Sequence, residues 1–424
     1  MKYKPQRTMY TTSSSYHVRE MIFVSAFKKT VIKLGIYFVI VIAVLLIAIL
    51  PHLFYTKKQI LLHRHVRYPT DLKYILFWTE PKKHRGHTFK KPEFSTGQNL
   101  FINQKCSHIN CYITYDKNAL REGQDFDAVV FDIDEVKKMN LNTFNLSRYS
   151  DQVYIFRAME SAEKHGICDR DFDNFFNWTW TYKLDSDIPH PFFNIHSINN
   201  TIVGPKKNMK WIDNMATTKK MSNKLKTKNK AVAWIVNKCK LKTIHQDFIK
   251  DLSNELRGYN YSLDMYGSCG QKKCPGGRSI KCHNIVETSY YFQLVLEDSF
   301  AEDYITEGIV SAMTYLAIPI VYGSTNYKQF LPPGSYINAQ TFDIKKLGAL
   351  IDYLIKNREM YQFFLDWKNY YYYTARSKTS VCDLCAKLNK NNSVKTYTQF
   401  RKWWNPDFMD TCQRMSLVHR FHEP

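Results

Sequence analysis

The chain has 424 residues, more than one ordinary domain needs, and 44% of them are hydrophobic. That content is enough to build sizeable cores and excludes an intrinsically disordered protein. The net charge of +22 would suit a nucleic-acid-binding protein. However, the lysines are scattered and no recognised binding motif accompanies them, so no nucleic-acid partner is expected.

An apolar run near the N-terminus predicts a membrane anchor. Residues 34–50 carry no charge, and with residues 51–55 they form a 22-residue stretch. As a helix this stretch would be ~33 Å long, enough for a ~30 Å hydrocarbon layer. A cleaved signal peptide is disfavoured, because the run is long, starts late and lacks a small-residue cleavage site. We expect a cytoplasmic tail at 1–33, a transmembrane signal anchor at 34–55 and a stem at 56–70.

Cysteines and glycosylation sequons all follow this run. The ten cysteines lie beyond residue 105, and the four Asn-x-Ser/Thr sequons predict N-glycans on Asn145, Asn177, Asn199 and Asn391. This distribution predicts a type II membrane protein with a lumenal, oxidised C-terminal part. Structural disulfides are favoured over a zinc site, because a second Cys-x2-Cys pair is absent. The sequence leaves their connectivity open.

Strand-like and helical stretches alternate beyond the stem. Apolar runs predict strands at 73–78, 111–114, 126–132 and 152–156. Since polar and helical stretches separate them, we expect an α/β domain over 71–225 with a mostly parallel sheet. The lysine-rich stretch 206–230 has no periodicity and is typical of a linker or an exposed loop.

A second α/β domain is expected over 230–370, followed by a cysteine-containing C-terminal extension at 371–424. Its predicted strands are 231–236, 262–266, 291–296 and 318–323, and its predicted helices cover 243–256 and parts of 344–367. The acidic turn Glu297-Asp298-Ser299 directly follows one of these strands. The run 303–307 (Asp-Tyr-Ile-Thr-Glu) is expected to open a further helix. Polar groups at the carboxyl end of a strand mark the edge where open α/β sheets bind ligands.

Five sequence blocks follow one another along the chain: Met159-Glu160-Ser161, the block 176–187, Trp234 to Cys239, Asp264 to Pro275, and the acidic turn with 303–307. In this order they resemble the α1,3-fucosyltransferases of glycosyltransferase family 10. The resemblance implies a GT-B-type α/β fold, with two Rossmann-like domains facing a cleft. It places the acceptor site in the first domain and the donor site in the second.

The resemblance also implies the activity. The expected reaction is inverting transfer of fucose from GDP-fucose, in α1,3 linkage, onto GlcNAc of protein-linked glycans at the Golgi membrane. The donor is a substrate, no tightly bound cofactor is expected, and no divalent metal is required for the mechanism. The core GlcNAc of an N-glycan, an antennal N-acetyllactosamine and a LacdiNAc unit remain open as acceptors.

Inverting transfer needs a base that takes the proton of the acceptor hydroxyl. Glu160 is the candidate, because it follows a strand end within the Met-Glu-Ser block. Asp185 and Asp187 are expected to have structural or acceptor-side roles rather than to bind metal. The candidate donor-binding residues are His245, Glu297, Asp298, Tyr304 and Glu307.

The donor side departs from the family pattern at three positions. His245 stands where the family has arginine, Asp298 where it has asparagine, and Gly308 where it has lysine. Losing two cations that contact the diphosphate would weaken transition-state stabilisation. The alternative function is therefore a catalytically impaired family member, a membrane-tethered protein that binds a glycan or a nucleotide.

Overall fold

The computed structural model describes residues 42, 61–62, 71–78, 94–120, 125–142, 144, 148–215, 223–236, 242–277, 279–376, 380–390, 395–407, 409 and 412–413. The predicted anchor at 34–55, apart from residue 42, and the sequons at Asn145 and Asn391 lie outside these residues. Among the residues described, no helix has the length and apolar character to cross a membrane.

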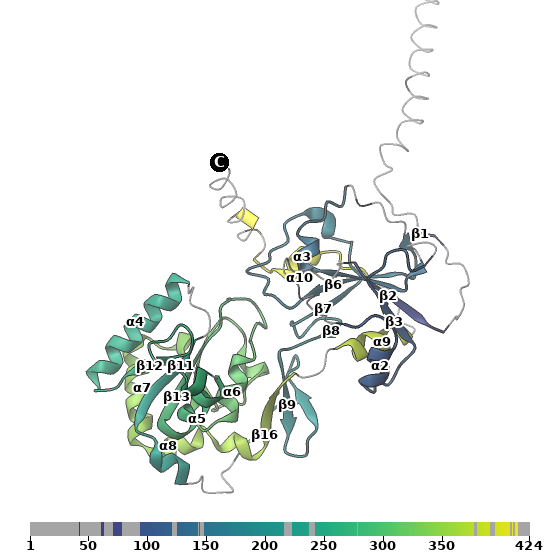
Figure 1. Cartoon of the computed structure of the whole chain (residues 1–424). Helices are drawn as coiled ribbons and strands as arrows, with labels where there is room; N and C mark the ends of the chain where they lie inside the picture. The colour runs from purple at the N-terminus through teal and green to yellow at the C-terminus, as the bar shows by residue number, and fades with distance from the viewer. Residues whose placement is uncertain are drawn as a thin grey trace, which may run out of the picture. The chain divides into compact units, whose positions relative to one another are not determined.

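The first of three larger sheets is built by the N-terminal half of the described chain (Figure 1). Its order is β3-β2-β4-β6-β7-β8, and every neighbouring pair is parallel. The strands are β2 (Lys73–Phe77), β3 (Cys111–Thr114), β4 (Ala128–Asp132), β6 (Val153–Ala158), β7 (Trp178–Thr181) and β8 (Ile188–Pro189). Two-residue strands β1 (Leu61–Leu62) and β5 (Arg148–Tyr149) complete this half.

Alternation along these strands puts side chains on two buried faces. On β4, Val129 and Phe131 point into one cluster, while Ala128 and Val130 point into the other. Short helices α2 (Asn99–Asn103) and α3 (Ile133–Val136) lie beside the sheet. Because both faces are covered, most residues of β2, β4 and β6 are apolar, as in parallel strands generally, whereas β7 alternates tryptophan with buried threonine.

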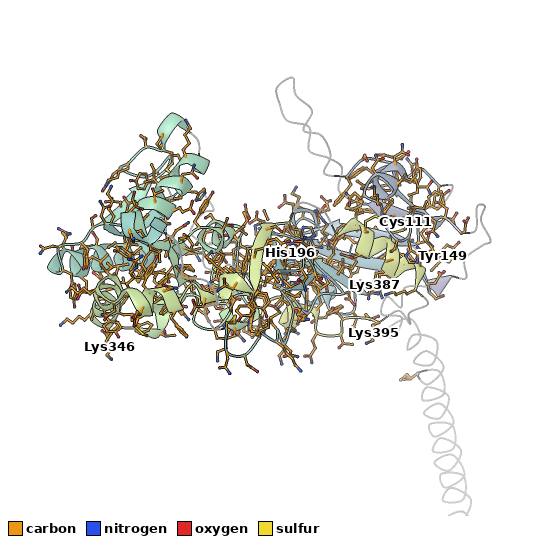
Figure 2. The ribbon with its side chains drawn as sticks, turned by 90° about the horizontal axis from the view of Figure 1, so that it is seen from below. Cys111, Tyr149, His196, Lys346, Lys387 and Lys395 are labelled. Atoms are coloured by element: carbon orange, nitrogen blue, oxygen red, sulfur yellow. A yellow bond between two sulfur atoms is a disulfide. The ribbon has the colours of Figure 1, made fainter. Side chains whose placement is uncertain are left out.

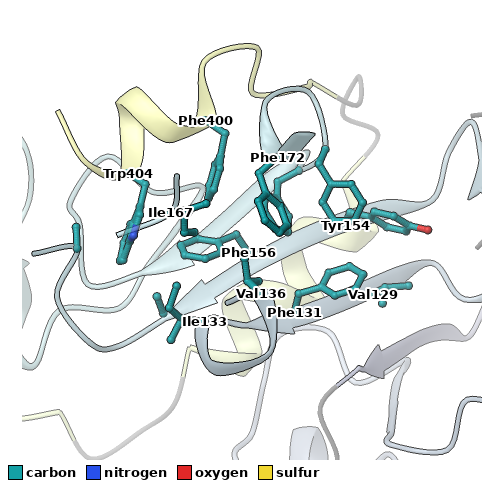
Figure 3. Close-up of a cluster of buried hydrophobic side chains, with 14 of the residues drawn as sticks. Val129, Phe131, Ile133, Val136, Tyr154, Phe156, Ile167, Phe172, Phe400 and Trp404 are labelled. Atoms are coloured by element: carbon teal, nitrogen blue, oxygen red, sulfur yellow. The ribbon is translucent and has the colours of Figure 1, made fainter. Parts of the chain in front are cut away.

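The C-terminal part of the chain returns to this first sheet. Helix α9 (Val381–Asn389) packs on one face through Leu384 and Cys385, and α10 (Phe400–Trp404) covers the other. Figure 3 shows Phe400 and Trp404 of α10 above Phe156, and both rings lie 4.9 Å from it, centroid to centroid. The expected C-terminal extension therefore supplies part of the first sheet's core.

Three disulfides join this returning segment to the first half. They pair Cys106 with Cys382, Cys111 with Cys385, and Cys168 with Cys412. A fourth bond, Cys274–Cys282, closes a short loop elsewhere. Figure 2 labels Cys111 of β3 and Lys387 of α9, the two elements that the Cys111–Cys385 bond joins. The prediction of disulfides over a zinc site is confirmed for these cysteines.

The second sheet follows along the chain, with order β12-β11-β13-β14-β15, and all its pairs are parallel. Its strands are β11 (Lys230–Ile235), β12 (Leu263–Tyr266), β13 (Tyr290–Leu296), β14 (Ile318–Tyr322) and β15 (Ile337–Asn338). The α/β class with parallel sheets is thus confirmed. Residues 62–424 cluster as one unit that contains both sheets, so the division into two domains stays a prediction.

Helices cover both faces of the second sheet. On one face α4 (Thr243–Gly258) and α7 (Ile344–Lys356) pack through Leu252, Leu256, Leu347 and Ile351. These apolar residues recur at intervals of three or four positions, so they share one side of each helix. Helices α5 (Ser279–Ser289) and α6 (Gly308–Thr314) contribute to the buried clusters of the other face, and α8 (Arg358–Phe363) follows α7.

A third, antiparallel sheet has the order β10-β9-β16. It contains β9 (Phe193–Ser197), β10 (Ile202–Gly204) and β16 (Tyr371–Ala375), and Figure 1 shows β16 beside β9. The remaining regular elements in the described part of the chain are the 3₁₀ turns η2 (Arg170–Phe172), η3 (Asn223–Thr227), η4 (Pro275–Gly277), η5 (Tyr327–Gln329), η6 (Ala339–Thr341) and η7 (Asp366–Asn369).

The helix expected to open at 303–307 begins later. Helix α6 starts at Gly308, and Asp303 has a φ of +58°, in the left-handed region. The Asp303 carboxylate accepts the backbone N–H of Leu184, and the Thr306 N–H donates to Glu297. These tertiary contacts hold 303–307 as an extended turn.

Candidate active site

The turn after β6 carries the candidate base. Glu160 is exposed, and the neighbouring Ser161 is buried. The backbone N–H of Ala162 donates to the hydroxyl of Tyr182 at 3.1 Å, which anchors the turn to the first sheet. Glu160 therefore presents its carboxylate to solvent at the carboxyl end of β6, where an acceptor hydroxyl could reach it.

The loop after β13, residues 297–300, meets this turn. The hydroxyl of Ser299 lies 2.6 Å from that of Ser161 and donates to Glu163 Oε2 at 2.7 Å. The backbone N–H of Phe300 donates to the same Glu163 oxygen at 2.6 Å. Hydrogen bonds therefore connect the carboxyl end of β6 in the first sheet to that of β13 in the second.

Glu163 also binds the lysine that precedes α4 as its N-cap. Lys242 Nζ lies 2.6 Å from Glu163 Oε1. Although burial raises the pKa of Glu163, the hydrogen bonds from Lys242, Phe300 and Ser299 outweigh it and hold that pKa below its usual value. Glu163 is thus a carboxylate at neutral pH, and three donors from the second half of the chain surround it.

Glu297, the first residue of the loop, is a buried acid. Its side chain is 2% exposed, its Oε1 accepts the Thr306 N–H at 3.0 Å, and its Oε2 has no partner among the described residues. Burial raises the pKa of Glu297 to about 7. In this arrangement Glu297 supports the turn that carries Glu307.

The other predicted donor-binding residues differ in exposure. Asp298 Oδ2 lies 2.7 Å from Lys164 Nζ, so the carboxylate that replaces an amide has a cation beside it. Glu307 is exposed immediately before α6. Gly308 opens that helix, and a Cβ added there would meet only Thr306 Oγ1, at 3.6 Å.

Tyr304 belongs to the core of the first sheet. It is 4% exposed, and its ring packs edge-on against Tyr182 and Phe192, at centroid distances of 5.1 and 5.7 Å. Burial, followed by the charges of Asp298 and Glu160, raises the pKa of Tyr304. Lys164 Nζ, from the turn after β6, lies 5.9 Å from the centroid of the Tyr304 ring.

His245 lies in the first turn of α4 and is 2% exposed. Its ring lies 5.5 Å from that of Phe300 and 5.8 Å from that of Tyr322, and its Nε2 has no partner among the described residues. Burial and the charge of Lys242 lower the pKa of His245, so the imidazole is neutral near pH 7. It does not replace the cation of the family pattern.

The two aspartates of the block 176–187 make structural contacts. Asp185 Oδ2 accepts the indole N–H of Trp403 and pairs with Lys207. Asp187 Oδ2 accepts the Thr179 N–H at 3.0 Å and the Tyr397 hydroxyl at 2.8 Å. Within the described residues no group of histidine, cysteine or acidic side chains could hold a metal ion.

One predicted glycosylation site lies in the interior of the fold. Asn177 is 2% exposed; its Oδ1 accepts the Tyr154 N–H, and its Nδ2 donates to the carbonyl of Lys395. A glycan on that nitrogen would displace these contacts, so we expect this sequon to be unoccupied. Asn199 lies exposed in the turn between β9 and β10.

Sequence reasoning missed Glu163 and Lys164. Neither belongs to a block of the resemblance, and both follow the Met-Glu-Ser block as ordinary charged residues of a polar turn. The sequence offers Lys242 as one of several cations that could compensate on the donor side, with Lys240, Lys272, Lys273 and Arg278, but it does not place their side chains. Only the packing of the turn after β6 against the loop after β13 brings Glu163, Lys164 and Lys242 together.

Two family models match most of the described chain. One, described as "Fucosyltransferase, N-terminal", matches residues 70–193. The other, described as "Glycosyltransferase family 10 (fucosyltransferase) C-term", matches residues 225–403. The chain belongs to this fucosyltransferase family. The two matches cover the two parallel sheets and the helices that return to the first of them.

Similar proteins carry the same family name. The chain is 29% identical over 370 residues to Alpha-(1,3)-fucosyltransferase C of Drosophila melanogaster, covering 84% of this chain and 82% of that protein. It is 26% identical to human 4-galactosyl-N-acetylglucosaminide 3-alpha-L-fucosyltransferase FUT5, covering 80% of each. A crystal structure of an α1,3-fucosyltransferase with GDP-fucose superposes with a TM-score of 0.44 at 15% identity, covering 79% of this chain and 95% of that one.

Proposed function

We propose that this fucosyltransferase transfers fucose from GDP-fucose, with inversion and in α1,3 linkage, onto GlcNAc of protein-linked glycans. The names of the Drosophila and human relatives specify an α1,3 linkage, which supports this part of the proposal. The observation that carries the proposal is the contact between the turn after β6 and the loop after β13. It brings an exposed carboxylate, Glu160, to the sheet edge where the acidic loop of the donor side lies.

In this mechanism Glu160 is the base. Its carboxylate takes the proton as the acceptor hydroxyl oxygen attacks the anomeric carbon of fucose. The bond from that carbon to the phosphate oxygen breaks on the opposite face, and its electron pair leaves with GDP. A side chain exposed at a strand end suits this task, because it can meet an acceptor without moving the core.

The donor would bind on the second sheet in a GT-B arrangement. Glu307, exposed just before α6, is suited to accept hydrogen bonds from ribose hydroxyls. The other predicted donor-binding residues would support this site without contacting the donor directly. Three of them, Glu297, Tyr304 and His245, are at least nine-tenths buried, and Asp298 is paired with Lys164.

We further propose that the protein is a type II Golgi membrane protein. The apolar run 34–55 would be its anchor, and the cysteines and sequons that follow would face the lumen. The long-range disulfides support an oxidising compartment for this part of the chain.

A transfer assay tests the function. The full chain in mild detergent is incubated with radiolabelled GDP-fucose and a panel of GlcNAc-terminated, N-acetyllactosamine and LacdiNAc glycans. We expect fucose on at least one acceptor, with an α1,3 linkage by glycosidase digestion. Glu160→Gln should reduce turnover by ~10²–10⁴ while retaining GDP binding. GDP binding without transfer to any acceptor would favour the catalytically impaired alternative.

A further inference from the structure

Two lysines meet the acidic loop after β13. Lys242 Nζ bonds Glu163 and lies 5.3 Å from the centroid of the Phe300 ring. Lys164 Nζ pairs with Asp298 at 2.7 Å and lies 5.9 Å from the centroid of the Tyr304 ring. Their side chains are 36% and 30% exposed, so neither lysine is buried by its ion pair.

The first turn of α4 adds to this positive region. The helix has 16 residues, and its N-cap, Lys242, makes no side-chain cap. The N-terminus of a helix carries a partial positive charge and free N–H groups that attract anions. In the same turn, the buried His245 Nε2 lacks a hydrogen-bond partner among the described residues, and the His245 ring lies 5.5 Å from that of Phe300 in the loop after β13.

We propose that Lys242 and Lys164 bind the diphosphate of the nucleotide donor, in place of the cations that the family pattern has at positions 245 and 308. The proposal rests on the proposed function and adds the residues that neutralise the leaving group. Both lysines come from segments that meet at the loop after β13, which lies at the carboxyl edge of the second sheet. That edge is where open α/β sheets bind their ligands.

The existing ion pairs are compatible with this role. An ammonium group has three N–H donors, so Lys242 can hold Glu163 and a phosphate oxygen at the same time. The pair also fixes the position of the ammonium before the donor arrives. When the bond between fucose and the phosphate breaks, the added negative charge on the diphosphate falls beside preplaced cations, which favours its departure.

Lys272 offers a matched control. It is another ion-paired, 44% exposed lysine of the same half, bound to Asp264 at 2.5 Å. It contacts β12, whereas the loop after β13 begins two strands away in the sheet. Replacing it by glutamine removes the same charge and a comparable ion pair without touching that loop.

Calorimetry on the full chain in detergent, with GDP and with guanosine, tests the assignment. We expect Lys242→Gln and Lys164→Gln each to weaken GDP binding by about tenfold or more, as the loss of one charge-assisted hydrogen bond implies. Guanosine affinity should stay unchanged, because it has no phosphate. Lys272→Gln should bind GDP like wild type. Lys242→Arg keeps the positive charge and should retain GDP affinity, and it replaces Lys242→Gln in the comparison if that variant folds poorly.

The outcomes separate this proposal from the proposed function. If wild type binds GDP and both glutamine variants bind it equally well, the lysine assignment is overturned and the fucosyltransferase function stands. A parallel loss of guanosine affinity would also overturn it, since the lysines would then support the fold rather than the phosphates. If wild type binds neither GDP nor guanosine, the proposed function and the lysine assignment fail together.

Discussion

Glu297 makes the stability of this protein dependent on pH. The carboxyl is buried and its pKa is raised from 4.5 to about 7. The folded chain therefore keeps this proton up to about pH 7, whereas the unfolded chain releases it near its ordinary value. The contribution to stability is complete below the unfolded pKa and is lost as pH rises through the folded one. At 1.36 kcal/mol per pKa unit, the loss amounts to about 3 kcal/mol.

Glu297→Gln removes this titration. The glutamine oxygen can still accept the Thr306 N–H, but the side chain has no proton to lose. Burying the amide can lower the free energy of unfolding, but by the same amount at every pH. This cost therefore cancels when the stability of the variant at one pH is subtracted from its stability at another. We therefore expect the variant to lose less stability than wild type between pH 5 and pH 8, by up to about 3 kcal/mol.

Urea unfolding at pH 5 and pH 8, with the disulfides intact, measures the effect. Glu359→Gln is the control, because it removes an exposed carboxylate in the first turn of α8 that is not among the charges acting on Glu297. It should follow the pH dependence of wild type. If Glu297→Gln also follows wild type, the buried carboxyl is ionised in the folded protein, and the reasoning from its burial is refuted.

Three other predictions concern different parts of the chain. Glycopeptide mass spectrometry should find Asn177 unoccupied, and a glycan there would contradict its buried hydrogen bonds; occupancy is expected at the exposed Asn199 if the lumenal topology holds. Gly323→Ala should destabilise the fold by about 1–3 kcal/mol in urea unfolding, because its Cβ would lie 2.9 Å from the Tyr327 hydroxyl, and an unchanged midpoint would refute this. If residues 34–55 are a type II anchor, the C-terminus should resist protease in sealed microsomes. Digestion of the C-terminus without detergent would show the opposite orientation in the membrane.

Among the described residues, eight of the eleven strands in the two parallel sheets could be predicted, because their signal is local. The strand expected at 111–114 has those bounds in β3. The helix expected at 243–256 begins at the same residue in α4 and ends two residues later, at Gly258. Apolar runs and three-to-four-residue spacing are properties of a short segment, so they survive the change from sequence to structure. Strand β7 was not predicted, because Trp178–Thr181 lies in a block that was interpreted by its resemblance.

The C-terminal segment shows what local patterns miss. The residues beyond 371 looked like an extension, yet α9 and α10 fill both faces of the first sheet. Cysteines that pair across sequence separations of 244 to 276 residues connect them to that sheet. No short-range periodicity encodes a partner at that distance.

The sequence by itself determined the family, the α/β class and the presence of Glu160 at a strand end, because motifs and strand patterns are properties of consecutive residues. Only the tertiary structure decided that Asn177 is buried, that Glu297 holds a raised pKa, and that Lys164 and Lys242 lie at the acidic loop. Burial and charge pairing depend on which distant segments pack together. The chemical state of a side chain is therefore set by neighbours that the linear order does not reveal.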